Sequence, residues 1–104
     1  MLFMSCSSNV DNQFIIDGRI DGAEEGEMIC LSYPIKQGEI WKWQYDTTYL
    51  RGGRFCFRGY IDDLRAASLS FPNMDYANLY IEPARITFKA QRNALYDYSL
   101  QGLS

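Results

Sequence analysis

The side chains that most often carry chemistry are scarce in this chain. It contains no histidine, which is the commonest general base near neutral pH and a principal ligand of zinc and copper. Ser-His-Asp and Cys-His catalysis are therefore excluded. Cys6, Cys30 and Cys56 form no Cys-x-x-Cys pair, which thioredoxin-type redox sites and the common zinc sites require. We expect no catalytic residue, no metal and no cofactor.

Aromatic residues at alternate positions form the most suggestive local pattern. Trp41, Trp43, Tyr45 and Tyr49 share one face of a predicted strand. The favoured interpretation is that these rings face the core, since a pleated, half-buried surface selects aromatic residues at alternate positions. The alternative is an exposed face that binds a glycan, a peptide or a partner protein, because so large an exposed patch marks an interaction site.

The other candidate residues favour structural roles. Cys30 and Cys56 lie opposite the apolar residues of their strands, which favours unpaired thiols packed as small hydrophobes; a disulfide stays open if the two strands are neighbours. The acidic residues near one turn fit no compact calcium loop, so we interpret them as solvated. They are Asp17, Asp21, Glu24 and Glu25. Glu82 and Pro83 are expected to form a structural turn.

Composition indicates one ordinary globular domain. The chain has 104 residues, a formal net charge of -3 and 47% hydrophobic residues. No apolar run approaches the ~20 residues of a membrane-spanning helix. There is no basic stripe of the kind that binds a phosphate backbone, so we expect no nucleic-acid partner.

Alternating apolar and polar residues predict about eight short strands, and therefore a small antiparallel β-sandwich. The turn at residues 21–26 predicts a hairpin between the first two strands, and residues 51–53 predict another between the third and fourth. Pro34 and Gly38 bound an expected loop. Open sheet edges would also permit a homo-oligomer. Strands are expected near residues 14–20, 27–33, 41–50, 54–61, 66–71, 79–81, 85–89 and 96–101.

The first residues resemble the end of a bacterial lipoprotein signal. A short apolar stretch leads to Cys6, with Phe3 where such signals usually have Leu, and a polar run follows. The resemblance implies that Cys6 is lipidated and that any membrane association is through this anchor. We therefore expect residues 1–12 to be a signal remnant or flexible tether, and residues 13–104 to be a single sandwich domain.

The order of several short segments resembles the β-rich N-terminal domain that precedes a thioredoxin-like or peroxiredoxin-like domain in Gram-negative envelope lipoproteins. These segments are residues 14–20, 29–33, 46–59, 79–83 and 98–102. Ala84 departs from the usual Gly after Glu-Pro, and the chain stops at Ser104, where a connecting helix and redox domain would begin.

The resemblance implies a noncatalytic accessory or interaction domain of an envelope thiol-disulfide oxidoreductase. It implies a location in the periplasm or at the outer membrane, with a thioredoxin-like domain or another envelope protein as partner. The alternative function is a stand-alone module that binds a glycan or peptide through the aromatic strand face.

Overall fold

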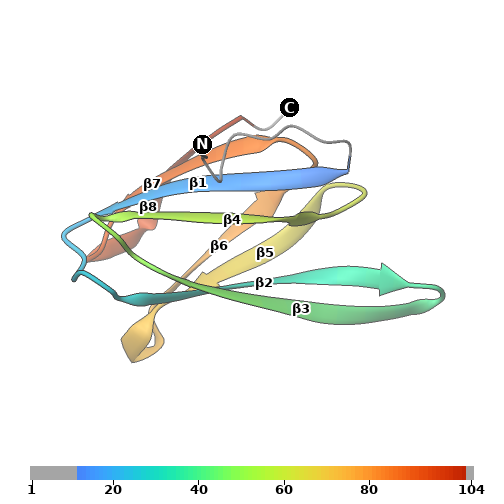
Figure 1. Cartoon of the computed structure of the whole chain (residues 1–104), viewed down its shortest axis with the longest axis horizontal. Helices are drawn as coiled ribbons and strands as arrows, with labels where there is room; N and C mark the ends of the chain where they lie inside the picture. The colour runs from blue at the N-terminus through green and yellow to red at the C-terminus, as the bar shows by residue number, and fades with distance from the viewer. Residues whose placement is uncertain (1–11, 103–104) are drawn as a thin grey trace, which may run out of the picture.

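Alternating buried and exposed side chains divide the strands between two packed sheets. The computed structural model describes residues 12–102. Two four-stranded sheets form a sandwich (Figure 1), which confirms the predicted all-β fold. The strands are β1 (Gln13–Asp21), β2 (Met28–Gln37), β3 (Ile40–Tyr49), β4 (Arg54–Tyr60), β5 (Arg65–Ser70), β6 (Tyr76–Ile81), β7 (Arg85–Gln91) and β8 (Ala94–Gln101). A 3-10 helix, η1, spans Pro72–Met74.

The two sheets differ in how their strands pair. Sheet A has the order β4-β1-β7-β8, and sheet B has the order β3-β2-β5-β6. Strands β1 and β7 are parallel, whereas the other paired strands are antiparallel. A parallel pair needs a long connection, and here most of the chain lies between β1 and β7. The mainly antiparallel sandwich therefore contains one parallel pair in sheet A.

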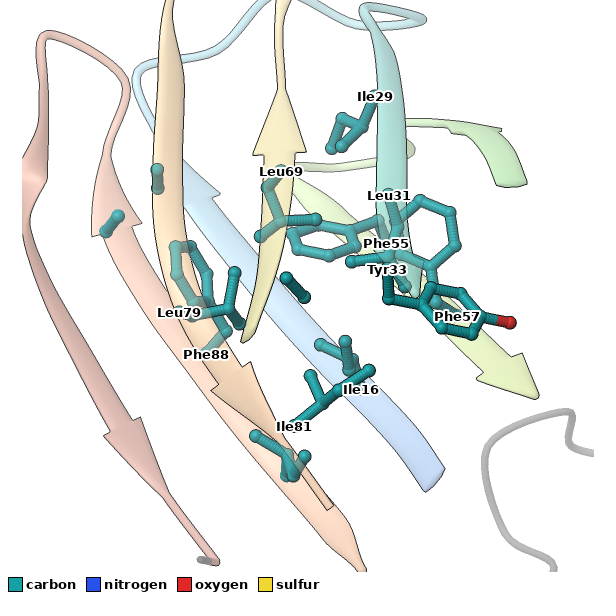
Figure 2. Packing of buried hydrophobic residues seen from close by; sticks show 14 of the residues in the cluster. Ile16, Ile29, Leu31, Tyr33, Phe55, Phe57, Leu69, Leu79, Ile81 and Phe88 are labelled. Atoms are coloured by element: carbon teal, nitrogen blue, oxygen red, sulfur yellow. The ribbon is translucent and has the colours of Figure 1, made fainter. Parts of the chain in front are cut away.

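The core lies between the sheets and is built from the inward-facing residues of both (Figure 2). Phe14 of sheet A meets Tyr33 of sheet B edge to face, with ring centroids 5.1 Å apart. No polar or charged residue is fully buried in the described part of the chain. Non-directional apolar burial is therefore the main source of stability between the sheets.

The β4 strand has the register that its sequence predicts. Phe55 and Phe57 are buried, whereas Arg54 and Arg58 are exposed. Ile16 of β1 lies opposite Phe57. A slip of one residue would turn the arginines toward the core, so this pairing is strongly specified.

Both predicted hairpins are wrong because the strands that they join belong to different sheets. Strand β1 pairs with β4 and β7, while β2 pairs with β3 and β5. Between β3 and β4, Gly52 and Gly53 form a tight turn with positive φ, closed by the Arg51–Arg54 bridge. The strands on either side then diverge, because a local turn does not force its flanking strands to remain paired.

The expected loop from Pro34 to Gly38 is also wrong. Strand β2 continues through Pro34 to Gln37, and a two-residue turn of Gly38 and Glu39 leads directly into β3. Pro34 lies beyond Ser32, the last residue of β2 that pairs with β5. Its missing N–H therefore breaks no ladder hydrogen bond on that side.

Candidate functional site

The four aromatic residues of β3 face solvent, so the favoured core-facing interpretation is wrong. The exposed fractions of Trp41, Trp43, Tyr45 and Tyr49 are 51%, 59%, 64% and 53%. Strand β3 is an edge strand, and its inward row is polar. Beyond Ile40, which is exposed at the hairpin turn, that row consists of Lys42, Gln44, Asp46 and Thr48. The usual pattern of apolar residues inside and polar residues outside is thus inverted on this strand.

The exposed aromatic residues belong to a larger surface, which we call the aromatic face. It is the outer surface of sheet B and includes Met28, Tyr76 and Tyr80, which are 47%, 60% and 57% exposed. Lys36 is the only charged residue among the outward strand positions of this sheet in the described chain. The face consists of Met28, Cys30, Ser32, Pro34, Lys36, Trp41, Trp43, Tyr45, Thr47, Tyr49, Ala66, Ser68, Ser70, Tyr76, Asn78 and Tyr80.

A groove crosses the aromatic face between its two outer strands. Trp43 and Tyr80 line the groove from β3 and β6, and smaller residues of β2, β5 and β6 complete its lining. Its volume is about 350 Å³. The smaller residues are Ser32, Ala66, Ser68 and Asn78. The arrangement offers ring surfaces for stacking beside hydroxyl and amide groups for hydrogen bonding.

Cations border one end of the aromatic face. The Arg65 guanidinium carbon lies 4.9 Å from the centre of the Trp41 ring, and Lys36 Nζ lies 5.9 Å from it. Arg65 also forms an ion pair with Asp62 at 2.9 Å. The two cations hold the indole by cation–π attraction, which fixes this ring more firmly than its exposure alone would.

Beneath the aromatic face, Asp46 joins the polar row of β3 to the core. It accepts hydrogen bonds from the Tyr33 hydroxyl at 3.3 Å and from Gln44 Nε2 at 3.1 Å. Burial, the nearby Asp46 charge and this hydrogen bond raise the pKa of Tyr33 to about 12. Nothing in the sequence pattern indicated this contact, because it depends on β3 lying at the sheet edge.

The raised pKa of Tyr33 predicts a loss of stability in alkali. In the unfolded chain a tyrosine loses its proton near pH 10, whereas folded Tyr33 keeps it to about pH 12. The contribution is therefore complete below pH 10 and is lost as the pH rises through 12, by roughly 2–3 kcal/mol. Urea unfolding across this range should show the decline. Tyr33→Phe should flatten it, and an unchanged pH dependence in this variant would contradict the assignment.

The cysteines do not form the pair that the sequence left open. Cys30 is a free, partly buried thiol in sheet B, whereas Cys56 in sheet A is disulfide-bonded. The expectation of an unpaired thiol is thus confirmed for Cys30 and wrong for Cys56. Cys6, the predicted lipidation site, lies outside the described residues.

A second hollow lies at the end of the sandwich where β2 begins. Its volume is about 800 Å³, and Arg92 occupies its wall between Glu27 and Asp75. Asp21 and Glu24 from the acidic turn also line it. Within residues 12–102 no group of potential ligands is arranged to hold a metal ion. Glu27 and Asp75 pair with Arg92, and Asp21 pairs with Arg19, so the hollow contains structural ion pairs rather than a site with an evident reaction.

Glu82 and Pro83 lie in the connection from β6 of sheet B to β7 of sheet A. The Ala84 carbonyl in the same connection accepts a hydrogen bond from Ile15 N–H at 3.0 Å. This segment lies apart from the aromatic face. In the part of the chain that the structure describes, no helix has the length and apolar character needed to cross a bilayer.

Comparison with known proteins assigns the chain to a family. No curated protein and no solved structure matches it. A family model described as "Domain of unknown function (DUF4369)" matches residues 14–102. This range covers every strand of the sandwich except Gln13, the first residue of β1. The chain therefore belongs to the DUF4369 family.

Proposed function

We propose that this chain is a noncatalytic binding domain that contacts a partner through the aromatic face. The observation that carries the proposal is the exposure of Trp41, Trp43 and Tyr45 on one sheet surface. The core is filled without these rings, so packing within the domain does not account for them. Exposed tryptophan and tyrosine are the residues most enriched at the energetic centres of protein interfaces.

The partner that we propose is an envelope protein, in the first place a thioredoxin-like domain of a thiol-disulfide oxidoreductase. The order of strand segments over residues 14–102 supports this role through the family resemblance. The disulfide at Cys56 fits an oxidising compartment such as the periplasm. In this role the domain positions a redox partner and takes no part in electron transfer.

A second candidate function is the binding of a neutral saccharide in the groove between Trp43 and Tyr80. The specific support is its lining, in which two aromatic side chains flank Ser32, Ser68 and Asn78. A sugar ring presents an apolar face that stacks on an aromatic ring, and its hydroxyls pair with small polar side chains. No charged residue lines this groove, which favours a neutral ligand over an ionic one.

Both candidates predict that Trp43→Ala weakens binding at least tenfold while leaving folding intact. The indole is 59% exposed, so its removal should change the free energy of unfolding by less than about 1 kcal/mol. Binding is measured by tryptophan fluorescence and calorimetry, with a purified periplasmic thioredoxin-like domain in one series and neutral oligosaccharides in another.

The control is Lys89→Ala. Lys89 is exposed on β7 of sheet A and lines no hollow with residues of the aromatic face in the described chain, so its loss should leave binding unchanged. A response to the protein alone supports the accessory role, and a response to sugars alone supports the second candidate. If neither series gives a Trp43-dependent signal, both candidates are wrong.

A further inference from the structure

Strand β3 has an open edge. Sheet B ends at β3, which pairs only with β2 among the described residues. Figure 1 shows the β2–β3 hairpin projecting past the strands of the other sheet. The edge is therefore accessible along much of the ten-residue strand.

The register of the hairpin shows which backbone groups point to this edge. Gln37 and Ile40 flank a two-residue turn and so form a hydrogen-bonded pair. At the other end of the hairpin, Leu50 N–H donates to the Glu27 carbonyl at 2.9 Å. At both ends, therefore, it is the even-numbered residues that direct their backbone groups toward β2. The odd-numbered residues of β3 therefore direct their N–H and C=O groups away from β2. These are Trp41, Trp43, Tyr45, Thr47 and Tyr49.

Two of the devices that usually prevent edge pairing, a proline and a bulge, are missing from β3. The strand contains no proline, and its pairing with β2 is continuous from Ile40 to Tyr49 without a bulge. The strand does carry charged residues on its inward row, Lys42 and Asp46, and these disfavour pairing with any strand that does not present the matching charges. Natural sheets usually protect long exposed edges with such features, because an unpaired edge is a template for another strand.

We propose that β3 pairs antiparallel with β3 of a second copy of this chain, about a two-fold axis at Gln44. In this register Lys42 lies opposite Asp46 of the second copy, and Trp43 lies opposite Tyr45 of the second copy. Each contact occurs twice, as a two-fold axis requires. Opposite charges and aromatic pairs directly across two strands stabilise a sheet.

The neighbouring registers are less complementary. An axis at Tyr45 would place Lys42 opposite Thr48 and remove both ion pairs. An axis at Asp46 would place the two Asp46 carboxylates opposite each other, which destabilises a sheet. The register at Gln44 is thus the one that joins the strand's positive and negative side chains.

Lys42 and Asp46 are both available for this contact. Neither forms an ion pair with another residue in the described range 12–102. Asp46 accepts two hydrogen bonds within the chain and has further acceptor capacity. In the proposed dimer they occupy a non-hydrogen-bonded pair, where opposing side chains lie closest. The two aromatic faces then become one continuous surface across two copies.

The dimer is tested by sedimentation velocity from about 5 µM to about 500 µM, because an interface formed by one strand pair is small and should dissociate in the micromolar range. Lys42→Glu is expected to weaken dimerisation about tenfold, since it turns both ion pairs into repulsions. Asp46→Lys should do the same. Mixing these two variants should restore association, because each introduced charge then faces its opposite. Lys89→Glu, on the exposed face of sheet A, makes the same change in net charge and should have no effect.

A cross-linking experiment covers the case in which Asp46→Lys disturbs the fold. Gln44 lies opposite itself at the two-fold axis, so Gln44→Cys in a Cys30→Ser background should form an intermolecular disulfide on mild oxidation. Glu39→Cys, at the turn, should not. A wild-type chain that stays monomeric at the highest concentration overturns the proposal, as does a dimer that Lys42→Glu leaves unchanged. The latter result would indicate pairing through another surface.

Discussion

Replacing Arg92 with methionine is expected to lower the free energy of unfolding by about 3–5 kcal/mol. Arg92 Nε lies 2.6 Å from Glu27 Oε2, and another guanidinium nitrogen lies 2.7 Å from Asp75. The Glu27 side chain is only 10% exposed. Methionine keeps most of the side-chain volume but leaves this carboxylate without a cation in a poorly solvated position, and that cost dominates.

Arg92 also connects three parts of the sandwich end. It donates a hydrogen bond to the Pro72 carbonyl at 3.1 Å, and its guanidinium lies 5.3 Å from the centre of the Phe71 ring. Its backbone N–H donates to the Asp21 carbonyl at 2.8 Å. Burial lowers the pKa of Arg92, but hydrogen bonds to Asp75 and Glu27 and their charges outweigh it and raise the pKa. The guanidinium therefore stays charged throughout the ordinary pH range.

Urea unfolding measures the loss, with Arg19→Met as the matched control. Arg19 pairs with Asp21 at 3.4 Å, but both side chains are more than half exposed, so this variant should lose less than about 0.5 kcal/mol. Adding Glu27→Gln to Arg92→Met should recover part of the loss, because the unpaired charge disappears. Equal losses in the two methionine variants would show that burial of Glu27 does not set the cost.

The sequence predicted the strands and the core better than the pairing between strands. A period of two identifies a half-buried strand from its own residues, and so Phe55 and Phe57 were correctly assigned to the core against Arg54 and Arg58. Pairing depends on which sheet a strand enters after a turn. The Gly52-Gly53 turn has the expected chemistry but leads from sheet B to sheet A. No residue in or beside the turn indicates that the chain changes sheets there.

The aromatic face, too, was only partly predictable from the sequence. Spacing correctly placed Trp41, Trp43, Tyr45 and Tyr49 on one face of a strand, but periodicity does not say which face is inward. Tyr76 and Tyr80 were missed because their strand also carries Leu79 and Ile81, which satisfy the core on their own. A usable signal was present in such strands: when both alternating sets are apolar, one of them must be exposed in a sandwich with a single core.

Binding and self-association make separate demands on the same strand. The side chains of Trp43 and Tyr45 form the aromatic face, whereas their backbone groups form the open edge. Lys42→Glu should thus impair dimerisation and leave ligand binding unchanged. Trp43→Ala should impair ligand binding and also weaken dimerisation, because it removes the cross-strand pair of Trp43 with Tyr45 of the second copy. Dimerisation is therefore judged on Lys42→Glu, so failure of one proposal leaves the other standing.

Gly18→Val is expected to cost roughly 3–5 kcal/mol, although valine favours strands and Gly18 does not have a positive φ. Gly18 lies in β1 directly opposite Phe55 of β4, and the Phe55 ring covers it. A Cβ atom added to Gly18 would collide with three atoms of that ring. Phe55 is 5% exposed and packs edge to face on Phe57, so the ring cannot move aside without losing its place in the core.

A double-mutant cycle with Phe55→Ala separates this collision from a general effect of mutating β1. Phe55→Ala alone should also cost about 3–5 kcal/mol, because it opens a cavity beside Phe88, whose ring centroid is 6.2 Å away. In the double variant the valine at position 18 fills part of that cavity and meets no ring. The double variant should therefore lose about as much free energy of unfolding as either single variant, and much less than the sum of their two losses. Additive losses, measured by urea unfolding, would mean that Gly18 is required for some reason other than the space that the Phe55 ring occupies.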